Sequence, residues 1–284
     1  MYINKICYNN NENRGICMYI NTFLFFILGV ICSYFFNNVA FRLPIKEPLF
    51  GKSKCDMCNH ELTFKEKIPL ISYIMQKGKC NWCHQKISPM YFIFELITGL
   101  LFSATYVTFI DFNNAGIQIL YGLVFISTLL IIMVSDFKYM LIPNELLIVS
   151  GIVLVVLKIY LQFQNEEIST FMDAGYEILF MIIEAIVMFF IMFVIKKIGD
   201  VVFKKESLGG GDVKMMALVA IIIGYKMSII VIFIASFIAL PISIYNAYKK
   251  NEVMLPFGPY LAIGSIIIFL CNINFDMVLE FISK

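Results

Sequence analysis

Long apolar runs, separated by short polar segments, dominate the sequence. They fall at about 19–41, 90–110, 115–135, 142–162, 176–195, 213–225, 227–247 and 256–275. Roughly 20 apolar residues cross the hydrocarbon core of a bilayer, and such a run satisfies its backbone groups there only as a helix. The pattern therefore predicts an all-α polytopic membrane protein with about eight transmembrane helices. The sixth run is short, and we interpret it as a tilted or partly embedded helix.

The composition agrees with this prediction. The chain has 284 residues, of which 60% are hydrophobic and 15% charged, whereas about 25% of the residues in a soluble domain are charged. A net charge of +2 gives no indication of a nucleic-acid surface. Residues 1–18 are predicted to form an N-terminal tail. Met18 stands directly before the first run, so residues 1–17 are either a dispensable extension or the product of an upstream start.

Basic residues are distributed unevenly between the connecting segments. Lysine and arginine gather in 42–89, 196–214 and 248–252, whereas the loop 163–175 is acidic. Counting the predicted helices places all three basic segments on one side of the membrane. Because basic loops remain in the cytoplasm, we predict that this side is cytoplasmic.

The segment 42–89 contains two C-x-x-C pairs, CDMC at 55–58 and CNWC at 80–83. Two such turns can place four thiolates around one tetrahedral zinc ion, although the gap of 21 residues slightly exceeds the usual window. A site with four protein ligands has no open position, so the metal is predicted to be structural. Disulfides and free thiols are the alternatives, and a cytoplasmic location argues against disulfides. The predicted zinc ligands are Cys55, Cys58, Cys80 and Cys83.

Charged residues also occur within the predicted spans. Placing a charge in a membrane costs free energy, so each such residue is a candidate for a functional role. Glu184 lies near the middle of the fifth run. It either pairs with another polar group in the bundle or has a functional role. Glu95 and Lys158 are interpreted as structural residues whose side chains reach the interface, with Lys158 pointing outward.

Two aspartates stand at the predicted cytoplasmic ends of spans. Asp136 ends the third run, and Asp212 follows the glycine triplet 209–211. Two carboxylates that share a site cannot both ionise easily, and such a pair can hydrolyse a peptide by general acid–base catalysis. The residues Gly209, Gly210 and Gly211 would let a substrate backbone approach. The alternatives are a flexible turn with Asp212 as a helix cap, or a phosphate loop, for which the G-K-[ST] element is absent.

Several motifs, in order, resemble the prepilin peptidase family, also called type IV leader peptidases. The similar segments are GVICSYFFNNVAFRLP, KSKCDMCNHELTFKEKIPLISYIMQKGKCNWC, YFIFELITG, DFKYMLIPNEL, GGGDVKMMA and LPFGPYLAIG. The resemblance covers about 28–265. It places Asp136 and Asp212 at the family's catalytic aspartates and the four cysteines at its zinc ligands.

The resemblance implies a bifunctional enzyme of the bacterial inner membrane. Such an enzyme cleaves the basic leader of prepilins or pseudopilins at the cytoplasmic face, then methylates the new N-terminus with S-adenosylmethionine. It further implies a first transmembrane helix at 19–41, a zinc loop at 42–89 associated with methyl transfer, and a peptidase domain at 90–284. The expected partners are these substrates and membrane lipid, with no nucleic acid.

Two other classes of protein were weighed against this hypothesis. A polytopic transporter would use the intramembrane charges to line a pathway, but the internal repeat common in transporters is not evident in the sequence. A membrane scaffold would bind partners through its zinc loop and would have no need of Asp136. The sequence does not distinguish between pilins, secretion pseudopilins and DNA-uptake pseudopilins as substrates.

Overall fold

The structure is a computed structural model that describes residues 11–49, 51, 53–55, 57–204, 207–249 and 256–283. The first ten residues of the predicted tail lie outside this part. Within it the chain is almost entirely helical, and the only β-pairing consists of two isolated bridges. The chain divides into two compact units. One comprises residues 1–42 and 46–110, and the other comprises residues 43–45 and 111–284.

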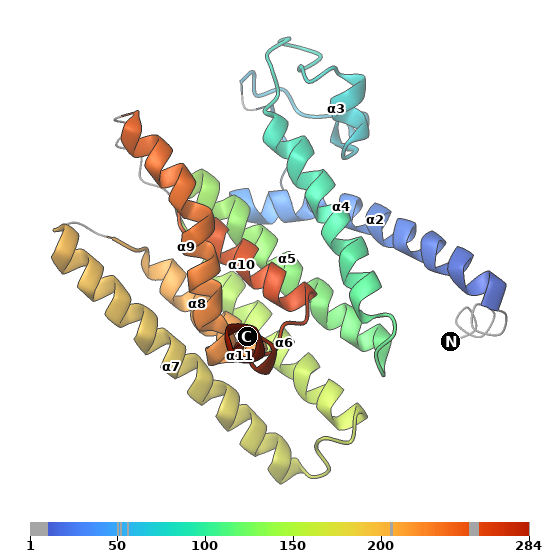
Figure 1. Cartoon of the computed structure of the whole chain (residues 1–284). Helices are drawn as coiled ribbons and strands as arrows, with labels where there is room; N and C mark the ends of the chain where they lie inside the picture. The colour runs from blue at the N-terminus through green and yellow to red at the C-terminus, as the bar shows by residue number, and fades with distance from the viewer. Residues whose placement is uncertain are drawn as a thin grey trace. The chain divides into compact units, whose positions relative to one another are not determined.

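The first unit has two long helices joined by the cysteine-containing loop (Figure 1). Its elements are α2 (Asn11–Arg42), η1 (Phe64–Lys67), α3 (Ile71–Met75) and α4 (Pro89–Phe109). Helices α2 and α4 pack closely where Gly29 meets Gly99. A Cβ on Gly29 would lie 2.8 Å from the carbonyl oxygen of Thr98, and one on Gly99 would lie 2.8 Å from Val30 Cγ2. Small residues at such crossings let membrane helices approach closely.

The second unit is a bundle built around α5. Its helices are α5 (Ala115–Tyr139), α6 (Asn144–Gln164), α7 (Phe171–Phe203), α8 (Gly210–Ile223), α9 (Tyr225–Tyr248), α10 (Gly258–Leu270) and α11 (Phe275–Ser283). Helix α5 packs on α6 and α10, and α8 packs on α6, α7, α9 and α10. The side chains of Phe125, Ile126 and Leu129 in α5 are fully buried, as are Met215 and Met216 in α8. The unit therefore has its core along α5 and α8.

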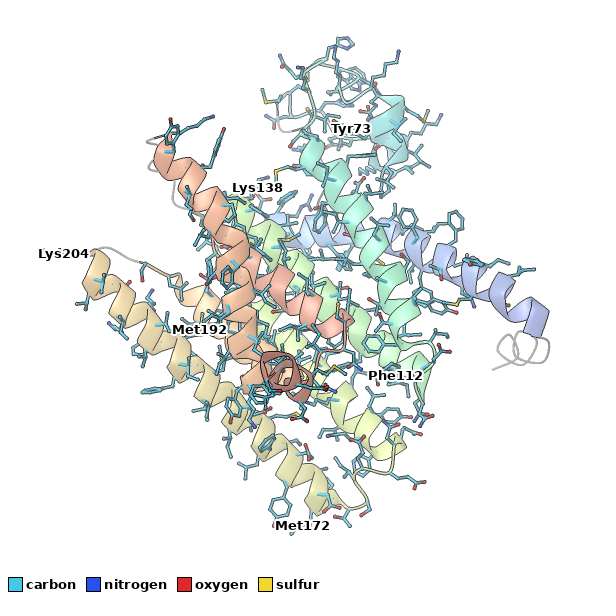
Figure 2. The ribbon with its side chains drawn as sticks, viewed as in Figure 1. Tyr73, Phe112, Lys138, Met172, Met192 and Lys204 are labelled. Carbon is cyan, nitrogen blue, oxygen red and sulfur yellow. The ribbon has the colours of Figure 1, made fainter. Side chains whose placement is uncertain are left out.

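Local signals explain where these helices begin and end. Thr170 and Asp173 form a capping box at the start of α7; Figure 2 labels Met172 near this end of α7 and Lys204 at the other. Helix α5 ends at Tyr139, and its C-cap Met140 adopts a left-handed conformation. Gly224, with φ +82°, separates α8 from α9. Because glycine adopts positive φ without steric cost, it allows a break between two apolar helices.

The prediction of an all-α membrane protein is confirmed. Six helices in the described part of the chain are long and apolar enough to cross a membrane, and they correspond to six of the eight predicted runs. Helices α8 and α10, with 14 and 13 residues, fall short. Fourteen residues extend about 21 Å, against a hydrocarbon core of about 30 Å. The predicted count of eight is thus not confirmed. Helix α2 starts at Asn11, so residues 11–18 of the predicted tail are helical.

Candidate functional site

Asp136 lies in the last turn of α5, and its side chain is only 6% exposed. The chain folds back immediately after it. The N–H of Met140 donates to the carbonyl oxygen of Asp136 at 2.9 Å, and Ser135 Oγ donates to the carbonyl oxygen of Leu141 at 2.6 Å. These bonds satisfy groups at the helix end. They hold Asp136 at the point where α5 turns into α6.

Asp212 is the third residue of α8 and is 5% exposed. Gly209 is the N-cap of this helix, and its N–H donates to the Asp212 carboxylate. A carboxylate at the third helical position that binds the N-cap N–H is half of a capping box. The other oxygen, Oδ1, is buried and has no hydrogen-bond partner. The cap interpretation therefore explains one oxygen of Asp212 and leaves the other unexplained.

Both carboxylates converge on Gly258, the first residue of α10. The N–H of Gly258 donates to Asp136 Oδ2 at 3.1 Å. A Cβ on Gly258 would lie 2.6 Å from Asp136 Oδ2 and 3.1 Å from Asp212 Oδ1. No side chain fits between the two oxygens and the backbone of α10. The structure therefore brings together two predicted site residues from α5 and α8, at a glycine that sequence reasoning had not singled out.

The electrostatic setting of Asp212 follows from these contacts. Asp212 lies in α8, outside the six candidate spans. Burial, followed by the negative charge of Asp136, raises the pKa of Asp212 to about 7, against the smaller lowering effects of the Gly209 N–H and the Lys196 charge. Two neighbouring carboxylates titrate as a pair. At neutral pH the geometry thus favours one proton shared by the two groups.

The three glycines of the predicted substrate-approach loop have different surroundings. A Cβ on Gly211 would lie 2.9 Å from Ile142 Cβ, and one on Gly209 would lie 3.2 Å from Asp212 Oδ2. A Cβ on Gly210 would meet nothing within 4 Å. Gly211 therefore allows close packing of α8 against the α5–α6 turn. Of the three, only Gly210 faces open space.

A second link between the two aspartate motifs involves Lys214, whose Nζ donates to Asn144 Oδ1 at 2.9 Å. Asn144 is the first residue of α6, two positions after Ile142. The start of α8 is thus held against the α5–α6 turn both by apolar packing and by a hydrogen bond. These contacts fix the relative positions of the helix ends that carry Asp136 and Asp212.

The last turns of α7 hold the segment that leads into α8. Lys196 Nζ donates to the carbonyl oxygen of Leu208 at 2.7 Å. The N–H and hydroxyl of Ser207 donate to Asp200 Oδ1 at 2.7 and 3.0 Å. Gly199 leaves room for Ser207, since a Cβ there would lie 2.8 Å from Ser207 Cβ. Sequence analysis missed these α7 residues because only the fold shows their contacts.

The four predicted zinc ligands form one cluster. Their sulfur atoms all lie within 4.8 Å of one another, and Cys55 Sγ is 4.0 Å from Cys83 Sγ. Zn–S bonds of about 2.3 Å in a tetrahedron place sulfur atoms about 3.8 Å apart, so the cluster fits a zinc ion. Each C-x-x-C turn lies on a short antiparallel pairing, Lys54 with Glu61 and Lys79 with Lys86.

The thiols of this cluster differ in acidity. Backbone N–H groups of Cys83 and Trp82 lower the pKa of Cys80 to about 7. The N–H of His60 favours the Cys58 thiolate, but burial and the neighbouring thiols Cys55 and Cys83 outweigh it and raise the pKa of Cys58 to about 11. Crowding therefore opposes four thiolates in the absence of a cation. A divalent metal would stabilise them, as in known tetracysteine sites.

The remaining intramembrane charges have structural partners. Glu184 accepts a hydrogen bond from the N–H of Tyr225, the first residue of α9, and interacts with the charge of Lys158. Lys158 Nζ donates to the carbonyl oxygens of Ile221 and Ile222 at 2.7 and 3.4 Å. The prediction that Lys158 points outward was wrong, because the lysine binds the carbonyls left unpaired at the end of α8. Glu95 accepts from the Leu70 N–H at 2.6 Å.

A polytopic helical protein with two buried carboxylates facing one glycine has the layout of a membrane-embedded acid–base hydrolase. Comparison with known families agrees with this class. The model of the bacterial peptidase A24 N-terminal domain matches residues 27–109, and the model of the type IV leader peptidase family matches residues 123–244. The chain belongs to the type IV leader peptidase family.

Curated relatives match nearly the whole chain. A prepilin leader peptidase/N-methyltransferase of Bacillus subtilis is 31% identical over 269 residues, covering 92% of this chain and 97% of the relative. The protein of the same name from Vibrio cholerae is 30% identical and covers 88% and 97%, and that from Pectobacterium carotovorum is 27% identical and covers 84% and 89%. No solved structure matches the chain.

Proposed function

We propose that this protein cleaves the leader peptide from prepilins or pseudopilins and methylates the N-terminus that cleavage exposes. Relatives that are named for both activities match this chain along nearly their whole length. The observation that carries the proposal is the convergence of Asp136 Oδ2 and the unpartnered Asp212 Oδ1 at Gly258. Membership of the family gives this pair of carboxylates its reaction class.

The two aspartates act as one acid–base unit in this proposal. A water molecule held between them loses a proton to the ionised carboxylate as its oxygen attacks the scissile carbonyl carbon. The protonated carboxylic acid then donates its proton to the leaving nitrogen, the C–N bond breaks, and the new amine departs. Peptide hydrolysis by such a pair requires one charged and one neutral carboxyl group at the start.

The contacts of the two residues support different roles for them. Asp136 accepts a hydrogen bond from the first N–H of α10, and the positive end of a helix stabilises a negative charge. Asp212 has one oxygen without a partner, so a proton on Oδ1 has no competing donor. We therefore assign the base to Asp136 and the acid to Asp212.

The proposed site faces the cytoplasm of a bacterial inner membrane, because the segments that flank it are the basic ones. Both aspartates lie at helix ends, next to the α5–α6 turn and the lysine-containing segment before α8. A basic substrate leader would also remain on the cytoplasmic side, because basic segments are retained there. The substrate backbone would pass Gly210, where the structure leaves open space.

Methyl transfer is assigned to the first unit, in which Cys55, Cys58, Cys80 and Cys83 would hold a structural zinc ion. Four protein thiolates leave no open coordination position, so the metal would fold the loop and would not activate a substrate. S-adenosylmethionine would supply the methyl group. The cysteine residues would then affect methylation through the shape of the loop.

Coexpression with a candidate prepilin tests the proposal, with mass spectrometry of the prepilin N-terminus as the readout. The parent enzyme should yield a shortened and methylated N-terminus. Asp136→Asn and Asp212→Asn should each yield full-length, unmethylated prepilin at normal enzyme levels in the membrane. Processing by either variant at near the parent rate would overturn the assignment of these residues.

A further inference from the structure

Helix α3 lies beside α4 and not beyond its end. The N–H of Leu70 donates to Glu95 at 2.6 Å, and the rings of Tyr73 and Phe92 are 5.2 Å apart. Figure 2 labels Tyr73 where α3 meets the start of α4. Glu95 is six residues into α4, which corresponds to about 9 Å along the axis at 1.5 Å per residue. The loop therefore turns back, so that α3 lies level with the first two turns of a candidate span.

A strained turn produces this arrangement. Leu70 has φ +58° and ψ −52°, and the N–H of Ile71 donates to the carbonyl oxygen of Pro69 at 2.6 Å. These values describe a classic γ-turn, which is rare for a residue with a side chain. The Glu95 bond to Leu70 holds that turn in place. The conformation directs α3 along α4.

The side of α3 that is not packed on α4 is apolar and exposed. Ile71, Ile74 and Met75 are 54%, 64% and 75% exposed, and their spacing places them on one helix face. On α4, Met90 and Ile93 in the first turns are 57% and 50% exposed. An apolar surface beside the first turns of a candidate membrane span is suited to contact with lipid.

Basic residues flank this apolar face in the sequence. Lys65 and Lys67 lie in η1 before α3, and Lys77 and Lys79 follow it. The single acidic residue between positions 63 and 79 is Glu66, which binds Thr63 and Asn81. Apolar side chains next to lysines form the pattern of segments that lie in the headgroup region of anionic membranes.

We propose that α3 is an interfacial membrane anchor, with Ile71, Ile74 and Met75 in contact with lipid acyl chains and the flanking lysines on anionic headgroups. The ligand is the bilayer surface itself. The anchor holds the tetracysteine loop against the membrane. The inference concerns the first unit alone and stands whether or not the aspartates cleave peptides.

Fluorescence quenching in lipid nanodiscs tests this anchor. The chain has one tryptophan, Trp82, so Trp82→Phe removes the background and Ile74→Trp places a probe on the apolar face. Gln85→Trp in the same background is the matched control, because Gln85 is exposed on the second C-x-x-C turn. Zinc content reports whether each loop is folded, and Met75→Trp replaces Ile74→Trp if the latter loses zinc.

Shallow brominated lipids should quench the Ile74→Trp probe by about two-fold and the Gln85→Trp control far less, since interfacial helices insert about 5–10 Å. Anionic lipid should increase this quenching, and Lys77→Gln with Lys79→Gln should remove the increase. Quenching by aqueous iodide in place of brominated lipid would overturn the anchor. So would shielding from both quenchers, which would indicate a protein partner on this face.

Discussion

The tetracysteine cluster and the aspartate pair are assembled in opposite ways. The four cysteines come from two short turns in one loop, and each turn is closed by local backbone hydrogen bonds such as Cys55 N–H to the carbonyl oxygen of His60. Asp136 and Asp212 come from different helices, and a third helix provides the backbone between them. The first site depends on local spacing, whereas the second depends on the packing of the bundle.

This difference determines how each site should respond to change. A bound metal orders a local loop directly, so loss of a ligand should be felt mainly within that loop. A site built from packed helices should respond to any change at the helix contacts, because displacing a catalytic group by about 1 Å can cost about 10²-fold in rate. The rate of leader cleavage measures both kinds of response.

Gly258→Ala should cause the largest loss among the packing variants. The added Cβ would intrude on Asp136 Oδ2 and Asp212 Oδ1 together, so cleavage should fall by about 10²-fold. Gly116→Ala, near the start of α5 in open space, is the control and should retain the parent rate. Mass spectrometry of prepilin N-termini over a time course measures both. Equal rates for the two variants would show that the space beside Gly258, between the two carboxylates, is not where cleavage takes place.

Gly211→Ala should have a smaller effect, with Gly210→Ala as its matched neighbour. The new methyl group at position 211 would press on Ile142. Overpacking costs about 1–3 kcal/mol. If the resulting shift of α8 against the α5–α6 turn raises the barrier to cleavage by about 1.4 kcal/mol, the rate falls about ten-fold. Gly210→Ala meets no protein atom and should change the rate less. A reversed order would indicate that the substrate backbone, and not Ile142, limits the space at this loop.

Lys196→Met should move the pH–rate profile more than it lowers the maximal rate. The lysine charge lowers the pKa of Asp212, which burial and Asp136 raise. Without it the Asp212 proton is held to a higher pH, so the alkaline limb should move upward by less than about one unit. Lys196→Arg keeps the charge and should restore the parent profile. If the Lys196→Met profile coincides with the parent profile, the lysine charge does not affect Asp212, and Lys196 serves only to bind the carbonyl oxygen of Leu208.

Cys58→Ser with Cys80→Ser should affect cleavage least. The double variant should lose zinc and N-terminal methylation, because the proposed zinc ion requires all four clustered thiolates to order the loop. Cleavage should partly survive, since the proposed hydrolytic residues Asp136 and Asp212 lie in the other unit. Metal analysis and mass spectrometry of the same samples measure all three quantities. Complete loss of cleavage together with normal levels of enzyme would contradict the separation of the two sites.

The local parts of this protein could be predicted from the sequence. The C-x-x-C spacing identified four sulfur atoms that cluster, and apolar run length identified six helices that can span a membrane. Asp136 and Asp212 were recognised through their motifs, and because a charged group at the edge of a membrane span is energetically unfavourable unless it has a function. In each case the signal lies in consecutive residues.

The parts that depend on packing could not be predicted. Gly258 belongs to a recognised motif, but its position between two carboxylates requires α10 to meet α5 and α8. Lys158 was expected to point outward, and its binding to carbonyls of α8 depends on the break at Gly224. Helix α8 was expected to be short, as observed, but α10 was counted as a full span because apolar composition does not reveal where a helix stops. Long-range contacts determine all three.

The central claim is that Asp136 and Asp212 form one acid–base unit, and the rate of leader cleavage by the two Asn variants and their double mutant tests it most directly. Each single variant should lose at least about 10²-fold in rate, since each removes a proton-transfer group. The double mutant should be little worse than either one, because residues that act as a unit are not additive. Independent losses that multiply in the double mutant, or a single variant at near the parent rate, would contradict the account.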